Sequence, residues 1–171
     1  MRHLLLVAAV VLALPSHAAE AAPVPAAKAQ LERLKALAGT WKGPAGEAGA
    51  KETFEAVTTF KVTGGGSAVV ETLGPGTPHE MVTVYHLDGE DLLLTHYCAA
   101  GNQPTMRAVP SGAEDAIAFD FLRGTNMSLT DVHMHAARLR FAGPDRLVGE
   151  WTSWKDGKPS GTMRFDLTRQ K

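Results

Sequence analysis

The sequence predicts an all-β protein, a single antiparallel up-and-down β-barrel of about eight to ten strands preceded by a short N-terminal helix. One amphipathic segment, residues 27–38, ends at Gly39-Thr40-Trp41, and about ten short segments of alternating polarity follow it to the C-terminus. Short connections make consecutive strands antiparallel, and a long meander closes on itself because open edges invite aggregation. A two-sheet sandwich is the alternative, but the regular hairpin spacing favours a barrel.

Residues 1–18 have the pattern of a secretory signal peptide. A short cationic start precedes an unbroken apolar run over residues 4–14, and small residues then predict cleavage after Ala18, with Ala21 as the alternative. The run is too short to span a bilayer. We therefore expect a protein exported to the periplasm or the extracellular space, with no transmembrane segment in the mature chain.

The rest of the chain has the composition of one ordinary domain. Residues 19–27 are rich in Ala and Pro and predict a flexible tether, which leaves residues 28–171 as a single β-barrel domain. Seventeen Lys and Arg residues against eighteen Asp and Glu residues give a net charge of −1, which argues against a nucleic-acid-binding surface. Cys98 is the only cysteine, so no internal disulfide can form. We interpret it as a small buried apolar side chain, with a reactive or metal-binding thiol as the alternative.

Each element follows from its own periodicity. From Lys28, apolar residues recur at helical spacing at Leu31, Leu34 and Leu37, and Gly39 is a natural helix end. After the strand that contains Trp41, alternation and turn residues predict strands over residues 53–62, 67–73, 79–87, 91–98, 105–109, 117–122, 133–141, 146–154 and 161–168.

The hairpin around Asp88-Gly89 predicts one group of inward side chains. With these two residues as the loop, the facing pairs are His79 with Cys98, Met81 with His96, and Tyr85 with Leu92. A His, Met and Cys grouping can hold a soft metal such as copper. Histidines satisfied within the core or at the rim are the simpler interpretation.

The last three strands predict a second inward group. In residues 133–141, the apolar side chains share a face with His133 and His135, so both histidines are expected to point inward. Pairing across Asp156-Gly157 places Glu150 and Trp154 on the same inner face as the apolar residues of the last strand.

An apolar lumen with a few polar groups is typical of a ligand site, and no motif indicates a catalytic nucleophile. We therefore predict a non-enzymatic exported barrel that binds a small, mostly apolar molecule in its lumen. The residues expected to contact this molecule are His133, His135, Glu150, Tyr85, His96, Cys98, Phe119 and Trp154.

Two alternatives stay open. One is a haem- or metal-binding barrel that uses His133 or His135, with His79, His96 and Cys98 as further metal ligands. The other is an enzyme that uses His135 and Glu150 as an acid–base pair in the lumen.

Residues 37–43, Leu-Ala-Gly-Thr-Trp-Lys-Gly, resemble the Gly-x-Trp opening of the calycins, the superfamily of lipocalins, fatty-acid-binding proteins and related barrels. The chain from Leu34 onward is also similar to a group of uncharacterised exported bacterial proteins. The matching segments are residues 65–73, 81–86, 95–104 and 151–158. These resemblances imply a calycin-like barrel and transfer no activity.

A looser resemblance is to the nitrobindin-like haem barrels. Those proteins share the Gly-Thr-Trp-x-Gly start found at residues 39–43, and they end in a strand whose histidine ligates haem within a His-x-His-like segment. Residues 129–135 look like that segment, so this resemblance implies a haem ligand at His133 or His135. The chain differs from the pattern by continuing for two further strands.

Overall fold

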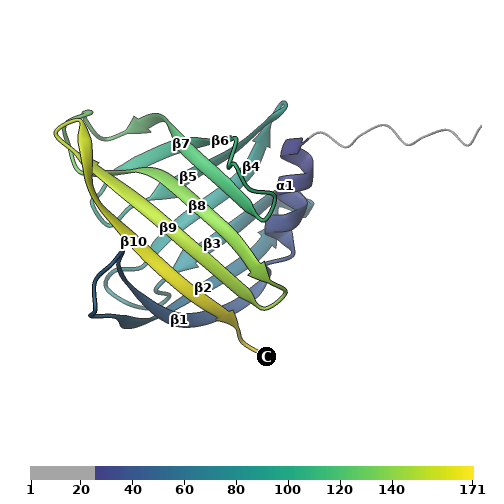
Figure 1. The fold of residues 1–171 in the computed structure, drawn as a ribbon. Helices are drawn as coiled ribbons and strands as arrows, with labels where there is room; N and C mark the ends of the chain where they lie inside the picture. The colour runs from purple at the N-terminus through teal and green to yellow at the C-terminus, as the bar shows by residue number, and fades with distance from the viewer. Residues whose placement is uncertain (1–25) are drawn as a thin grey trace, which may run out of the picture.

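Ten antiparallel strands form one closed barrel in the computed structural model, which describes residues 26–171 (Figure 1). Each strand pairs with its neighbours in the sequence, and β10 pairs with β1 to close the ring. The elements are α1 (Ala26–Lys35), β1 (Gly39–Glu47), β2 (Phe54–Thr63), a 3-10 turn (Gly64–Gly66), β3 (Ala68–Leu73), β4 (Met81–Asp88), β5 (Asp91–Tyr97), β6 (Gln103–Val109), β7 (Ala116–Thr125), β8 (His133–Gly143), β9 (Arg146–Lys155) and β10 (Lys158–Arg169). The predicted fold class, an up-and-down barrel after a short helix, is confirmed.

The predicted signal peptide over residues 1–18 and most of the predicted tether lie outside the described residues. Within residues 26–171, no helix is both long and apolar enough to cross a membrane.

The helix α1 differs from its predicted bounds at both ends. It starts at Ala26, inside the predicted tether, because Ala27 packs into the core. It ends at Lys35, since the N–H groups of the residues at 37 and 38 bond carbonyl groups three residues back, which tightens the last turn. Leu37 was predicted to be helical, and it lies in this turn with its side chain buried.

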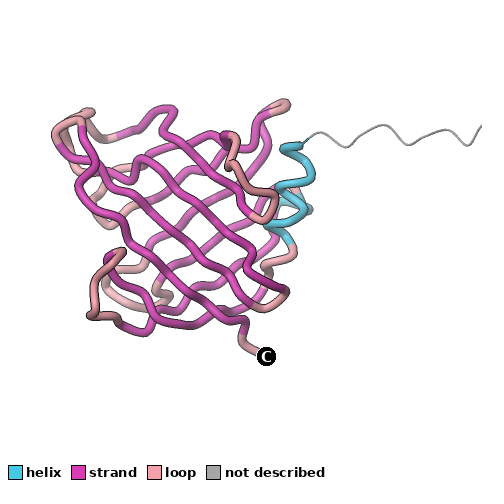
Figure 2. The backbone as a smooth tube through the Cα atoms, in the orientation of Figure 1, coloured by secondary structure: helices cyan, strands magenta, loops and turns pink. Residues whose placement is uncertain are grey.

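The helix covers one end of the barrel, where it contacts β2, β3, β4 and β5 (Figure 2). Trp41 at the start of β1 fills the space below, and its indole N–H donates to the carbonyl oxygen of Leu37 at 2.7 Å. The guanidinium of Arg169 lies 4.3 Å from the Trp41 ring centroid and donates to the carbonyl oxygens of Ala36 and Ala38. Trp41 therefore ties the helix to both strands at which the ring closes.

Gly43 lies where the backbones of β1 and β10 are in close contact. The regular pairs of this ladder stop at Lys42 with Thr168 and resume at Ala45 with Phe165. A Cβ atom on Gly43 would collide with the backbone carbonyl group of Asp166, which cannot move as a flexible side chain can. The seam that closes the barrel therefore requires a residue without a side chain at this position.

Side chains from opposite strands fill the middle of the barrel. The ring centroids of Tyr85 and Phe119 lie 5.8 Å apart, and those of His96 and Trp151 lie 4.9 Å apart. These contacts join β4 with β7 and β5 with β9, so the interior next to α1 is a packed core. Open space is left for the opposite end, where the β1–β2 and β3–β4 loops lie.

The seam predicts a large effect for Gly43→Ala. We expect this substitution to lower the free energy of unfolding by about 2–4 kcal/mol, because the added Cβ forces β1 and β10 apart. Urea unfolding followed by far-ultraviolet circular dichroism measures the change.

Gly161→Ala on β10 is the matched control. A Cβ at Gly161 would meet only side-chain atoms at 3.6 Å or more, so we expect a change within about 0.5 kcal/mol. Equal stability of the two variants would contradict the role assigned to Gly43.

Candidate ligand-binding site

The end of the barrel opposite α1 contains an apolar cavity of about 430 Å³, here termed the mouth cavity. Its size falls in the range of about 300–1,000 Å³ that is usual for small-molecule sites. The side chains that strand alternation directs into it come from β2, β3, β4 and β10, and the β3–β4 loop covers one side. The apolar lining includes Phe54, Ala56, Leu73, Met81, Met163 and Phe165.

The alternation of each strand explains why this lining is apolar. On β2, Ala56 lies on the same face as the buried Thr58 and Phe60. On β10, Met163 and Phe165 share a face with the buried Leu167. Phe54 continues the inner face of β2 to the rim, where 55% of its surface is exposed. An aromatic side chain left exposed beside an apolar cavity is available for contact with a ligand.

A row of polar side chains lies beneath the mouth cavity, and we term it the polar row. Glu71, Thr83 and His96 face one another on β3, β4 and β5, and all three are buried. Leu73 and Met81 form the next inner pair toward the cavity. Two residues along a strand span about 6.6 Å, so the polar row lies one side-chain layer below the cavity lining.

Hydrogen bonds satisfy only part of the polar row. The Tyr85 hydroxyl donates to Oε2 of Glu71 at 2.5 Å, and Oγ1 of Thr83 lies 2.9 Å from Nδ1 of His96. Nε2 of His96 and Oγ1 of Thr58 are buried and have no partner among the described residues. Thr58 is the next inner residue after Ala56 on β2, so it also lies just below the cavity lining. Unsatisfied buried polar atoms are uncommon and often mark a functional role.

Burial sets the protonation of the polar row. It raises the pKa of Glu71 to about 7, although the hydrogen bond from Tyr85 acts in the opposite direction. It lowers the pKa of His96 to about 4, so His96 is uncharged at neutral pH. The interior below the cavity therefore carries no positive charge and at most a partial negative charge near pH 7.

The hairpin of β4 and β5 has a different register from the predicted one. Asp88 pairs with Asp91, so the two-residue loop is Gly89-Glu90 rather than Asp88-Gly89. His96 consequently faces Thr83 instead of Met81, and Tyr85 faces Leu94 instead of Leu92. The shift is two residues, which preserves the face of every side chain. Tyr85 and His96 are buried within the barrel, as predicted.

The metal ligands predicted from this hairpin are not brought together. His79 is exposed in the β3–β4 loop and Cys98 is half-buried beyond the end of β5, while His96 is in the polar row. Within residues 26–171, no group of three or more His, Cys, Asp or Glu side chains could hold a metal ion.

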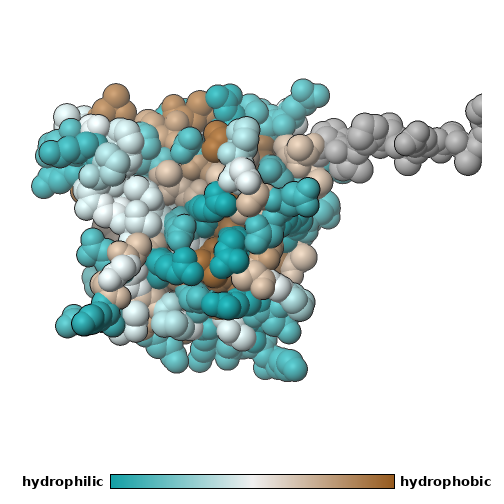
Figure 3. Space-filling view, in the orientation of Figure 1, coloured by the Kyte–Doolittle hydropathy of each residue, from teal (hydrophilic) through white to brown (hydrophobic). Residues whose placement is uncertain are grey.

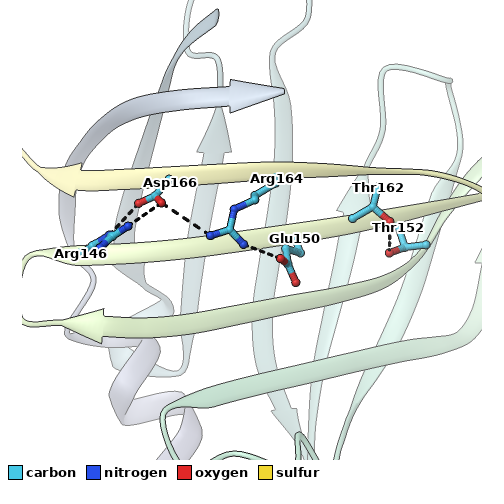
Figure 4. A network of polar contacts seen from close by, with 6 residues as sticks. All are labelled: Arg146, Glu150, Thr152, Thr162, Arg164 and Asp166. Carbon is cyan, nitrogen blue, oxygen red and sulfur yellow. Dashed lines mark hydrogen bonds and ion pairs between the residues drawn. The ribbon is translucent and has the colours of Figure 1, made fainter. Parts of the chain in front are cut away.

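Glu150 lies on the outside of the barrel, so its predicted inward orientation is wrong. Figure 4 shows it bound to Arg164 of β10, with Nη1 of Arg164 and Oε1 of Glu150 2.7 Å apart. The cause is a bulge in β10 between Pro159 and Gly161, which shifts the register by one residue and exchanges the two faces. Trp151 instead of Glu150 is opposite Met163. Figure 3 shows this side of the molecule, where mostly hydrophilic and neutral side chains surround small hydrophobic patches.

Trp154 is displaced from the predicted inner face by the same bulge. It faces Pro159 and His133 across its two ladders and is half-buried, with its ring stacked on His135 at a centroid distance of 3.7 Å. Phe119, in contrast, is buried against Tyr85 in the core.

His133 and His135 form an aromatic cluster with Phe121 and Trp154. The register of β8 and β9 shifts between Met134 and Ala136, so the predicted alternation does not extend to this end of β8. The His135 ring is held between Trp154 and Phe121, and its Nδ1 lies 3.0 Å from Nε2 of His133. Neither histidine lines the mouth cavity.

The hydrogen bonds of the two histidines fix their tautomers. Nδ1 of His133 lies 2.8 Å from the carbonyl oxygen of Asp131, and a carbonyl can only accept. Nδ1 of a neutral His133 therefore carries its proton, and Nε2 accepts from Nδ1–H of His135. This arrangement leaves one imidazole nitrogen with a free lone pair, Nε2 of His135. Glu150, the predicted acid–base partner of His135, faces Arg138 on β8 instead.

Thr58, Glu71 and Thr83 were not predicted as site residues from the sequence. A signal for Glu71 was present, because it alternates with Val69 and Leu73 on an otherwise apolar face. Thr58 and Thr83 gave no signal, since threonine is common on both faces of strands.

Comparisons with known proteins identify the fold and no activity. No family model and no curated protein matches the chain. The solved structure of Rv2717c from M. tuberculosis is similar, with a TM-score of 0.55 and 21% identity over 82% of this chain and 97% of that one. A protein of unknown function from the DUF3598 family of Nostoc punctiforme has a TM-score of 0.55 and 13% identity. That match covers 79% of this chain and 48% of the other.

The buried carboxyl of Glu71 predicts a measurable pH dependence of stability. The folded protein keeps this proton up to about pH 7, whereas the unfolded chain loses it above the ordinary value of 4.5. Glu71 therefore costs stability as the pH rises through this window. The free energy of unfolding of Glu71→Gln, minus that of the wild type, should rise by about 3 kcal/mol between pH 4.5 and 8.

Urea unfolding of both proteins at several pH values measures this difference. His96 acts in the opposite direction, because its lowered pKa costs stability as the pH falls below 6.5, but it titrates in both proteins and cancels. A difference that stays constant with pH would show that Glu71 is not held protonated by burial.

Proposed function

We propose that this protein is a non-enzymatic, exported binding protein that holds a small, mostly apolar molecule in the mouth cavity. The observation that carries the proposal is an apolar cavity of about 430 Å³ at the one barrel end that α1 does not cover. A calycin-like barrel used in this way encloses its ligand between the strands, and the pattern of residues 1–18 supports export of such a carrier.

The lining of the cavity supports an apolar ligand. Met81 and Met163 are flexible, polarisable side chains that adapt to the shape of a bound molecule. Phe54 and Phe165 add aromatic surface on the β2 and β10 sides. The mouth cavity is a different site from the predicted one, since none of the eight residues predicted to contact a ligand lines it.

The two alternative functions receive less support from the geometry. The His133 and His135 surroundings do not fit haem, because the His135 ring is enclosed by Trp154 and Phe121 and neither histidine lines the apolar cavity. An acid–base pair of His135 and Glu150 lacks its geometry, because Glu150 is bound to Arg164 on the outside of the barrel.

The proposal predicts that filling the cavity weakens binding. The neutral fluorophore N-phenyl-1-naphthylamine brightens in apolar sites, so its titration reports occupancy of the mouth cavity. We expect Met81→Trp to weaken its binding by about tenfold or more, because the larger side chain occupies the space of the ligand.

The matched control is Val82→Trp, one residue along β4 with its side chain on the opposite face. It should bind the fluorophore as the wild type does. Equal affinity of Met81→Trp and the wild type, or no binding by the wild type, would contradict the proposal.

A further inference from the structure

We infer that the mouth cavity selects an uncharged amphiphile, a molecule with an apolar body and one neutral hydrogen-bonding head group, and discriminates against carboxylates such as fatty-acid anions. The inference rests on the function proposed above and names the ligand class. Its basis is the contrast between an apolar cavity and the polar atoms directly below it, none of which belongs to a cation.

Among the described residues, no buried cation is available to hold a carboxylate. The buried polar and charged side chains of residues 26–171 are Thr58, Glu71, Thr83, His96, Asn102, Thr105 and His133, with no Lys or Arg among them. The cavity lining contains no Lys or Arg either; its ionisable residues are Glu55, which strand alternation turns outward, and the exposed loop residue His79. An unpaired carboxylate taken out of water costs several kcal/mol.

Two arginines bound within the barrel wall, Arg169 and Arg164, do not supply that cation. Arg169 lies at the opposite end, where it is held by Trp41, Asp145 and two carbonyl oxygens. Arg164 is on the outer face and is bound to Glu150. Both guanidinium groups are already paired, and both are separated from the mouth cavity by the barrel wall or the core.

The layer below the cavity has unsatisfied hydrogen-bonding capacity. Oγ1 of Thr58 and Nε2 of His96 are buried and have no partner among the described residues. Thr58 is opposite Leu73, which borders the cavity, and His96 is opposite Thr83, the next inner residue after the cavity-lining Met81 on β4. A hydroxyl, carbonyl or amide head group that reaches this layer could satisfy such an atom at no cost in charge. His96 stays neutral because burial lowers its pKa to about 4, so it offers no positive charge to an anion.

The test compares two ligands that differ only in the head group. Decanol and decanoate are each used to displace N-phenyl-1-naphthylamine at pH 8.5, where carboxylic acids are ionised and histidine side chains are neutral. Glu71, whose pKa burial raises to about 7, is also charged at this pH and adds to the repulsion of an anion. We expect decanol to displace the fluorophore at a concentration about tenfold lower than decanoate. The variant Met81→Lys places a cation in the cavity lining and should narrow this preference several-fold, whereas Val82→Lys on the opposite face should leave it unchanged.

Each outcome separates the inference from the function on which it rests. If the fluorophore binds and decanoate competes as well as decanol or better, the inference is overturned while the binding function stands. If the fluorophore does not bind the wild type, both fail. If the wild type prefers decanol, and Thr58→Val lowers the affinity for decanol but not for decanoate, the assigned head-group contact is supported.

Discussion

The whole structure depends on closing the ring between β1 and β10. Every other strand pairs with its neighbour in the sequence, so this ladder is the one pairing that joins the first strand to the last. It requires a backbone contact between Gly43 and Asp166 that only glycine permits. Trp41, two residues before, hydrogen-bonds to Leu37 and stacks under Arg169, so the same seam also anchors α1. The same residues at the seam therefore close the ring and hold the helix over one end of the barrel.

An unequal distribution of side chains along the barrel axis follows from this arrangement. Near α1, large side chains from opposite strands meet, and the core is packed. Toward the other end, the inner face of β2 carries the small side chain of Ala56, and Met81 and Met163 contribute to the lining from β4 and β10. The space that remains between them is the mouth cavity. The polar row of Glu71, Thr83 and His96 separates the two regions. Burial there disfavours charge, so the site can combine an apolar wall with neutral polar groups.

The sequence predicted the architecture well because period-two alternation and turn residues are local signals. All ten strands lie close to their predicted ranges, and Tyr85 and His96 are buried within the barrel, as predicted. The predictions for Glu150 and Trp154 were wrong because a single extra residue near Pro159 exchanges the two faces of a strand pair. A second irregularity at His135 ended the alternation of β8. Bulges of this kind depend on how the sheet bends as it closes, so the local pattern does not contain them.

The central claim is that ligand binds in the mouth cavity above the polar row. The most direct measurement is a two-dimensional ¹⁵N-correlated NMR titration of the protein with decanol. The account predicts that the largest shift changes occur at the amides of Ala56, Thr58, Leu73, Met81 and Phe165, which surround the cavity and its lower layer. Changes confined to the outer face around Glu150 and Arg164, or to the cluster of His133 and His135, would contradict it.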